Sequence, residues 1–281
     1  MAERIAVLGA GQMGNGIAHV FAQSGFDVTM IDVSADALER GRMTIASNLD
    51  RQIKKGTLPA AEKDSIMGRI RTAPSTDAIA DASLVIEAVT ENRDLKFKIF
   101  ADLDAKAKPG AILASNTSSI SITEIGARTK RPELVIGMHF MNPVPVMQLV
   151  EIIRGLATSD ATAVKILELT KAIGKTPVEA RDYPGFIANR ILMPMINEAV
   201  FCLMEGVGTA ESIDMVMKLG MNHPIGPLAL ADLIGLDTCL AILDVLHDGI
   251  GDPKYRPCPL LRTYVAAGWL GRKTKRGFYT Y

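Results

Sequence analysis

The hydrophobic and polar positions of this chain follow two patterns, which divide it near residue 183. In the first part, short apolar runs alternate with stretches whose apolar residues recur at helical spacing. The runs predict buried strands at residues 5–9, 28–32, 84–89 and 111–115. The stretches between them predict helices at residues 13–25, 35–55 and 92–107. This alternation is typical of an α/β domain built on an open parallel sheet.

Two further apolar runs, at residues 134–139 and 146–153, are joined only by a short loop that contains prolines. Such a loop is too short for a parallel crossover, so we expect these two strands to be antiparallel neighbours. If the chain folds back about Pro145, opposed residues lie symmetrically on either side of it. This register predicts that His139 faces Glu151.

The character of the chain changes after residue 183, where four Met- and Leu-rich helical stretches are joined by Gly and Pro. These stretches are residues 189–206, 212–220, 227–248 and 259–268. We therefore expect domains at residues 1–183 and 184–281, with the boundary near residues 183–185 and the second domain all-helical. Its apolar content exceeds the need of one small core, which favours a homodimer through this domain. A well-filled core is the alternative.

The segment at residues 9–14 has the G-x-G-x-x-G spacing, with Gly9, Gly11 and Gly14 separated by Ala10, Gln12 and Met13. It follows a predicted strand and opens a predicted helix, as a Rossmann-type dinucleotide-binding domain requires. Gly9 permits the tight turn, Gly11 lets the backbone approach a pyrophosphate, and Gly14 lets the helix pack on the strand. The alternative is a glycine-rich turn in another α/β protein.

Asp32 ends the second predicted strand, eighteen residues after Gly14. A carboxylate at this place accepts both ribose hydroxyls of NAD and repels the additional phosphate of NADP. Asp is also a common turn residue after a strand. With the glycine motif, this position predicts NAD as the cofactor.

In an open parallel sheet, ligands bind beyond the carboxyl ends of the strands. The relevant segments here are residues 9–14, 87–91, 115–119 and 139–142. His139 can thus lie over the nicotinamide ring.

Glu151 is the lone charge in its apolar strand and needs a partner. Paired with one ring nitrogen, it would fix the imidazole tautomer and stabilise the imidazolium. The alternative is a structural histidine at a strand end.

Hydroxyl side chains are concentrated at residues 115–121, directly after the fourth predicted strand. Ser121 and Glu124 match a helix capping box, which gives Ser121 a structural role. The serines at residues 115–119 precede that cap and could hydrogen-bond a substrate oxygen. Residue chemistry alone does not choose among them.

Composition and charge exclude several other classes of protein. Lys and Arg total 31, as do Asp and Glu, so no global field favours nucleic acid or acidic lipid. Residues 5–26 carry no formal charge, but they contain Gly, Gln and Asn, which a signal or membrane segment would not tolerate. The three cysteines are widely spaced and lack metal-ligand spacing. We expect a cytoplasmic protein without a metal.

Six blocks from the first strand to the last residues resemble the 3-hydroxyacyl-CoA dehydrogenase family, in particular its bacterial 3-hydroxybutyryl-CoA dehydrogenases. They read GAGQMGNGIA, SNTSS, GMHFMNPVPVMQLVE, PGFIANR, MKLGMNHPIGPLALADLIGLD and GRKTKRGFYTY. The resemblance implies that His139 is the catalytic base, that Glu151 orients it, that Ser118 lies near nicotinamide and substrate, and that Asn189 contacts the substrate. It also implies a homodimer.

The resemblance further implies two sets of binding residues. The cofactor side comprises Asp32, Glu91, Lys96, Ser118, Asn142 and Lys273. The segment that meets the CoA nucleotide of the substrate comprises Asn48, Arg51 and Lys55, with Ser118 and Asn189 at the acyl end. For this basic cluster, a solvated helix end is the alternative.

The implied reaction is the reversible NAD-dependent oxidation of (S)-3-hydroxybutyryl-CoA, or another short-chain 3-hydroxyacyl-CoA, to the 3-ketoacyl-CoA. Two alternatives are a dehydrogenase of a free 3-hydroxy acid and a non-catalytic NAD-binding protein with a structural or sensing role. Families that act on free 3-hydroxy acids share the two-domain plan but use a lysine base. The combination of Ser118, His139, Glu151 and Asn189 argues against a protein without catalysis.

Overall fold

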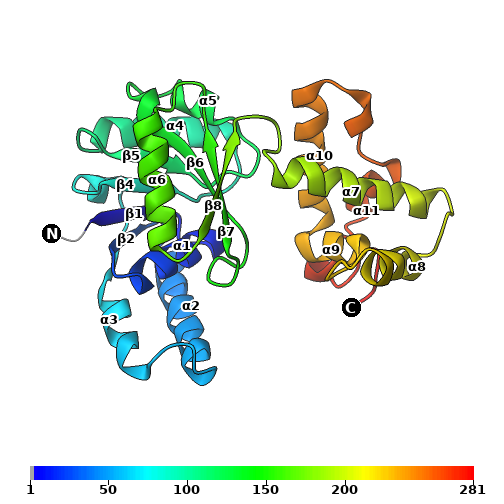
Figure 1. Cartoon of the computed structure of the whole chain (residues 1–281), viewed down its shortest axis with the longest axis horizontal. Helices are drawn as coiled ribbons and strands as arrows, with labels where there is room; N and C mark the ends of the chain where they lie inside the picture. Colours follow the sequence, from blue (N-terminus) through cyan, green and yellow to red (C-terminus); the bar gives the residue numbers. More distant parts are fainter. Residues whose placement is uncertain (1–2) are drawn as a thin grey trace. The chain divides into compact units, whose positions relative to one another are not determined.

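The computed structural model of the chain describes residues 3–281. It separates into two compact units, the first ending at Asp182 and the second beginning at Tyr183. The first unit is α/β and the second is all-helical (Figure 1). Both parts of the predicted fold class are confirmed.

The first unit is built on one sheet of eight strands, in the order β3-β2-β1-β4-β5-β6-β7-β8. The strands are β1 (Arg4–Leu8), β2 (Asp27–Ile31), β3 (Ile70–Ala73), β4 (Leu84–Glu87), β5 (Ile112–Ser115), β6 (Val135–Phe140), β7 (Leu149–Arg154) and β8 (Thr176–Arg181). Every neighbouring pair is parallel except β6 and β7. The order reverses between β1 and β4, and this is where a dinucleotide crevice opens in such sheets.

The pattern of apolar runs predicts six of these strands, and β3 and β8 are the two that it misses. They form the two edges of the sheet and are largely exposed, so neither has a continuous apolar run. Strand β8 also contains Pro177, which edge strands tolerate because one side of an edge strand has no partner. The central strands, by contrast, are buried along nearly their whole length.

The antiparallel register of β6 and β7 is the predicted one, symmetrical about Pro145. Gly137 pairs with Ile153, and His139 pairs with Glu151. Because side chains alternate between the two faces of a sheet, directly opposed residues project from the same face. The histidine and the glutamate are therefore neighbours through the register itself.

The helices of the first unit are α1 (Gln12–Gln23), α2 (Ala35–Lys54), α3 (Lys63–Gly68), α4 (Arg93–Lys106), α5 (Ile122–Gly126) and α6 (Asp160–Ala172). Several begin at a side-chain cap, as at Ser34, Asn92 and Ser159. In Figure 1, α6 crosses the near face of the sheet, while α2 and α3 project from it as an arm. The cap of α5 is Ser121, as its sequence predicts, and Asp182 accepts further hydrogen bonds from Ser121 Oγ and from Thr123 N–H.

The second unit contains α7 (Ala188–Met204), α8 (Ala210–Met215), a π turn η4 (Val216–Gly220), α9 (Pro227–Ile234), α10 (Leu236–Ile250) and α11 (Pro259–Ala266). The stretch at residues 227–248 forms two helices, because the backbone at Gly235 adopts φ +105°. Two buried carboxylates organise this unit: Asp214 accepts from the N–H groups of Leu228 and Ala229, and Asp232 accepts from those of Phe278 and Tyr279. Among residues 3–281, no helix combines the length and apolarity that a membrane crossing needs.

Candidate active site

The predicted nucleotide-binding loop joins β1 to α1 and is tightly packed at two glycines. A Cβ on Gly9, whose φ is +103°, would lie 2.6 Å from the carbonyl oxygen of Ala88. A Cβ on Gly14 would lie 1.8 Å from the carbonyl oxygen of Gly9. At Gly11, no heavy atom lies within 4 Å of the corresponding position. The loop therefore requires glycine for its own packing at two positions and leaves open space at the third, where the pyrophosphate of a dinucleotide would approach.

Asp32 directly follows β2 and is tied to this loop. Its Oδ2 accepts a hydrogen bond from the Ala10 N–H at 2.9 Å, and its Oδ1 accepts one from the Ser34 N–H at 2.9 Å. The carboxylate therefore lies beside the glycine turn, on the β2 side of the reversal in strand order. This place suits the ribose of a dinucleotide, and the bond to Ser34 also gives Asp32 the turn role that its position allows.

A pocket of about 440 Å³ adjoins the loop and brings together residues from both predicted binding sets. It is lined by Gly11 and Gln12, by Arg40, Thr44 and Asn48 of α2, and by residues 142–145. Gln12 Nε2 donates to Asn142 Oδ1 at 3.1 Å.

Of the remaining predicted CoA residues, Arg51 donates to Asn48 Oδ1 at 3.3 Å, whereas Lys55 lies beyond the helix end and does not line the pocket. Arg40 and Thr44 are pocket residues that the sequence analysis missed. Thr44 lies one turn and Arg40 two turns before Asn48 on the same helix, and this spacing is the signal that could have found them.

His139 and Glu151 form a buried pair across the β6–β7 hairpin. His139 Nδ1 lies 2.8 Å from Glu151 Oε2, and the two residues are 9% and 1% exposed. The hydrogen bond occupies one ring nitrogen and orients the ring, since its donor on the histidine must be Nδ1–H when Glu151 is ionised. At the adjacent residue, the Phe140 N–H donates to Asn116 Oδ1 at 2.9 Å, which connects the end of β6 to the end of β5.

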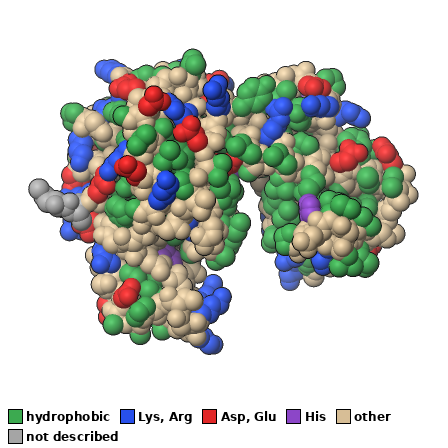
Figure 2. All heavy atoms as spheres, viewed as in Figure 1, with side chains coloured by type: hydrophobic (Ala, Val, Ile, Leu, Met, Phe, Trp, Pro, Cys, Tyr) green, Lys and Arg blue, Asp and Glu red, His purple; other side chains and the backbone are tan. Residues whose placement is uncertain are grey.

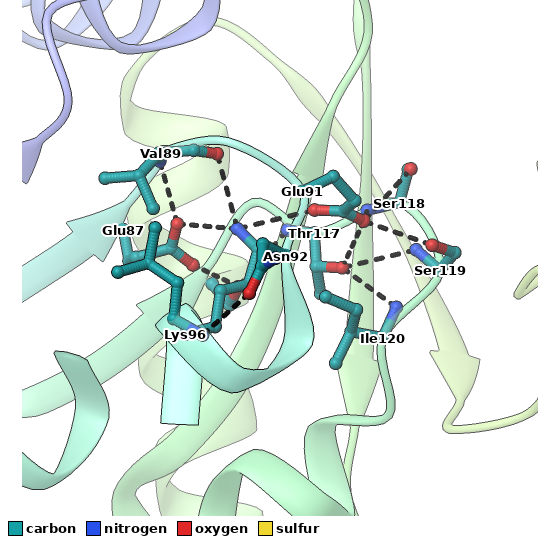
Figure 3. A network of polar contacts seen from close by, with 11 residues as sticks. Glu87, Val89, Glu91, Asn92, Lys96, Thr117, Ser118, Ser119 and Ile120 are labelled. Atoms are coloured by element: carbon teal, nitrogen blue, oxygen red, sulfur yellow. Dashed lines mark hydrogen bonds and ion pairs between the residues drawn. The ribbon is translucent and has the colours of Figure 1, made fainter. Parts of the chain in front are cut away.

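A network of charged and hydroxyl groups occupies the ends of β4 and β5 (Figure 3). The buried Lys96 ammonium lies 2.6 Å from Glu87 Oε1 and 3.4 Å from Glu91 Oε2. Ser115 Oγ donates to Glu87 Oε2 at 2.7 Å. The predicted cofactor residue Lys96 is thus enclosed by two carboxylates and is only 1% exposed.

Glu91 connects this network to the loop that carries Ser118. Its Oε1 accepts hydrogen bonds from Thr117 Oγ1 at 2.6 Å and from the Ser118 N–H at 2.9 Å, with Ser118 Oγ and Ser119 Oγ at 3.3 and 3.1 Å (Figure 3). Burial alone would raise the pKa of Glu91, but Lys96 and these hydrogen bonds outweigh that effect and lower it. Glu91 is therefore an anion that holds the Ser118 loop in place.

Glu87 is a member of the site that sequence analysis did not assign. It ends the apolar run of β4 as a lone charge, which is the same signal that identifies Glu151. The apolar run predicts a buried strand, and a buried carboxylate in it predicts a cationic partner. The sequence does not show which cation this is, because the partner, Lys96, lies nine residues later on a helix. Pairing across a strand register can be calculated from sequence numbers, whereas pairing between a strand and a helix cannot.

The other two predicted site residues, Asn189 and Lys273, belong to the second unit. Asn189 lies in the first turn of α7 and is buried, and its N–H donates to the carbonyl of Gly185. Lys273 Nζ donates to both carboxylate oxygens of Asp237, at 2.5 and 2.6 Å. In the part of the chain that the structure describes, no group of acidic, histidine and cysteine side chains could hold a metal ion.

Comparison with known proteins matches both units of the chain. The family model for the 3-hydroxyacyl-CoA dehydrogenase NAD binding domain matches residues 4–183, and that for the 3-hydroxyacyl-CoA dehydrogenase C-terminal domain matches residues 185–281. The first of these models describes NAD as the ligand of its domain, in agreement with the glycine loop and Asp32.

Individual relatives match over almost their full length. The chain is 57% identical over 279 residues to a probable 3-hydroxybutyryl-CoA dehydrogenase of Bacillus subtilis, covering 99% of this chain and 97% of the relative. It is 58% identical to a 3-hydroxybutyryl-CoA dehydrogenase of Bradyrhizobium diazoefficiens, with coverage of 99% and 95%. The crystal structure of (S)-3-hydroxybutyryl-CoA dehydrogenase from Ralstonia eutropha has a TM-score of 0.97 and 54% identity, covering 100% of this chain and 99% of that one. The chain therefore belongs to the 3-hydroxyacyl-CoA dehydrogenase family.

Proposed function

We propose that the chain is an NAD-dependent dehydrogenase that interconverts (S)-3-hydroxybutyryl-CoA and acetoacetyl-CoA. The observation that carries this proposal is the buried His139–Glu151 pair, with 2.8 Å between Nδ1 and Oε2, at the end of β6. It lies on a sheet whose β1 end carries a glycine loop open at Gly11. The names of the full-length relatives in Bacillus and Bradyrhizobium support this substrate.

His139 is the general acid and base of the reaction. Glu151 binds Nδ1, so Nε2 is the nitrogen that removes the proton from the substrate hydroxyl. The adjacent carboxylate stabilises the imidazolium that results, and in the reverse direction the imidazolium returns the proton to the ketone oxygen. NAD⁺ held at the glycine loop and Asp32 would supply the acceptor for the hydride that leaves carbon 3 of the substrate.

The cofactor residues are those of the glycine loop together with Asp32, Glu91, Ser118, Asn142 and Lys273. Asp32 favours NAD over NADP, because its carboxylate would repel a 2′-phosphate. Lys96 acts through Glu91, since its ammonium is enclosed by two carboxylates.

The proposed substrate residues are Ser118 and Asn189 for the acyl end. Each carries a hydrogen-bond donor of the kind that polarises a ketone oxygen. Asn48, Arg51 and Lys55 bind the CoA nucleotide. Asn48 lines the pocket beside Gly11, which supports this role most directly.

We also propose that residues 1–183 bind NAD and that residues 184–281 contribute to substrate binding and form a homodimer in the cytoplasm. The second unit exposes several large apolar side chains, among them Ile191 (67%), Met215 (58%) and Leu219 (79%). Figure 2 shows hydrophobic side chains over much of the viewed face of this unit. An apolar surface of this kind is typical of a face that a second copy covers.

The experiment that tests the function compares NADH oxidation with acetoacetyl-CoA and with free acetoacetate, and repeats the first assay with NADPH. We expect rapid turnover only with acetoacetyl-CoA and NADH. Turnover of free acetoacetate at a similar rate would instead indicate a dehydrogenase of free 3-hydroxy acids. Binding of NADH without turnover of either compound would indicate a structural or sensing protein.

A further inference from the structure

The network at the ends of β4 and β5 contains more charge than the positioning of Ser118 requires. Glu87 is fully buried, and its carboxylate accepts hydrogen bonds from Ser115 Oγ at 2.7 Å and from the Val89 N–H at 2.8 Å. Lys96 bridges Glu87 and Glu91 (Figure 3). Two carboxylates therefore share one ammonium, and the ionised network carries one net negative charge.

The exposed end of this network lies at the carboxyl edge of the sheet. The side chains of Glu87 and Lys96 are 0% and 1% exposed, whereas that of Glu91 is 38% exposed. Lys96 and the hydroxyl and N–H donors around Glu91 lower its pKa, so it is ionised at neutral pH. A ligand bound at this edge of the sheet would therefore lie beside the Glu91 carboxylate, whose other side is covered by protein.

The strand order indicates which half of a dinucleotide lies over this anion. The order reverses between β1 and β4, so the two halves of the cofactor lie over the two halves of the sheet. Asp32, after β2, marks the adenosine half. The nicotinamide half then lies over the ends of β4, β5 and β6. Glu91 and Ser118 follow β4 and β5, and His139 lies near the end of β6.

We propose that this network discriminates between the oxidised and the reduced cofactor by charge, a proposal that rests on NAD as the cofactor. The ring of NAD⁺ is cationic and that of NADH is neutral, so one net negative charge stabilises bound NAD⁺ alone. Glu91 supplies this charge at the surface of the crevice. Glu87 is a positioning residue that acts through Lys96, because it neutralises the ammonium that would otherwise cancel the charge of Glu91.

The test measures the dissociation constants of NAD⁺ and of NADH separately, by calorimetric titration of the full chain without substrate. For Glu91→Gln we expect the Kd of NAD⁺ to rise about tenfold while that of NADH changes by less than about twofold. This is the effect of a unit charge at about 10 Å in a medium of effective dielectric constant about 20. Such a change raises the reduction potential of the bound couple by about 30 mV.

Three further variants separate charge from loop order. Glu87→Gln should weaken NAD⁺ selectively, as Glu91→Gln does, although Glu87 is too buried to touch a ligand. Thr117→Val removes a hydrogen bond to Glu91 without changing the charge, so it should weaken both forms equally. Glu124→Gln removes an exposed carboxylate that is paired with Arg93 at 2.7 Å, and it should leave the ratio of the two constants unchanged.

The inference is overturned if Glu91→Gln raises the Kd of NAD⁺ and the Kd of NADH by the same factor. It is also overturned if the variant leaves both dissociation constants at their wild-type values. If Glu87→Gln fails to fold, the partly exposed Glu91 still decides the outcome. Failure of the wild-type chain to bind either form would overturn the proposed function together with this inference, and so is distinguishable from an unchanged ratio.

Discussion

At the scale of single residues, the site depends on one imidazole whose orientation is determined by its strand partner. His139→Gln keeps a polar side chain of similar size but cannot exchange a proton. We expect kcat to fall by roughly a hundred- to ten-thousand-fold, because general acid–base catalysis commonly contributes a factor of that size. The Kd of NADH should stay near the wild-type value. Steady-state rates and a fluorescence titration measure the two quantities.

The matched control for this variant is His247→Gln. His247 is an exposed histidine in the second unit, close to Asp248. Its replacement should leave kcat unchanged. Turnover of His139→Gln at the wild-type rate would remove His139 from the mechanism.

A second histidine, His19, makes folding stability depend on pH. It is fully buried in α1, and burial lowers its pKa to about 4, with a smaller contribution from Lys175 in the same direction and an opposing one from Gln23. The unfolded chain binds a proton near pH 6.5 and the folded chain does so only near pH 4. The stabilisation is therefore present above about pH 6.5 and is lost as the pH falls toward 4.

This difference predicts that the free energy of unfolding decreases by about 3 kcal/mol between pH 6.5 and pH 4 on account of His19. Urea unfolding curves at several pH values measure it. In His19→Gln this part of the slope should disappear, whereas His247→Gln should keep it. An equal slope in wild type and His19→Gln would contradict the assignment.

At the scale of secondary-structure elements, the glycine loop joins a packing requirement to a binding requirement. Gly14→Ala places a Cβ 1.8 Å from a backbone oxygen, so β1 and α1 must move apart. We expect a loss of about 1–3 kcal/mol of unfolding free energy together with weaker NADH binding. Gly11→Ala meets no protein atom and should weaken NADH binding with little loss of stability. Urea unfolding and NADH titration of both variants measure the two effects.

Gly68→Ala is the matched control for the glycine variants. Gly68 ends α3, away from the loop, and a Cβ there also meets nothing within 4 Å. Both stability and NADH binding should stay near the wild-type values in this variant. If Gly11→Ala binds NADH as tightly as Gly68→Ala does, the open space at Gly11 is not where the cofactor approaches.

At the scale of the whole molecule, the exposed apolar side chains of the second unit predict its state of association. Met215 and Leu219 lie one turn apart across α8 and η4, and both are more than half exposed. We expect the double substitution Met215→Lys and Leu219→Lys to shift the chain from dimer to monomer, because it buries two charges in the predicted interface. Light scattering after gel filtration measures the mass.

The first unit provides a matched control for this association experiment. Leu156 lies in a loop there and is 90% exposed. Leu156→Lys should leave the mass of the wild-type dimer unchanged. A monomeric wild-type chain, or a dimer that survives the double substitution, would contradict an interface through α8 and η4.

Local periodicity and short separations along the chain were enough to predict one group of features. The apolar runs predicted the central strands because those strands are buried on both faces. The glycine spacing predicted the nucleotide loop because the motif is short and continuous in the sequence, with packing requiring glycine at Gly9 and Gly14 and open space lying at Gly11. The His139–Glu151 pairing was also predictable, since an antiparallel hairpin relates its two strands by simple symmetry about Pro145.

Other features depend on where distant elements meet, and they follow only from the packing of the folded chain. Strands β3 and β8 have no apolar pattern that predicts them. They are defined by their positions at the two edges of the sheet. The Glu87–Lys96–Glu91 network joins a strand end, a helix and a loop, and its partners are chosen by packing. A hydrophobic pattern identifies which residues are buried. It does not identify the partner of a buried charge, because that partner is the oppositely charged group that lies nearby in the folded chain.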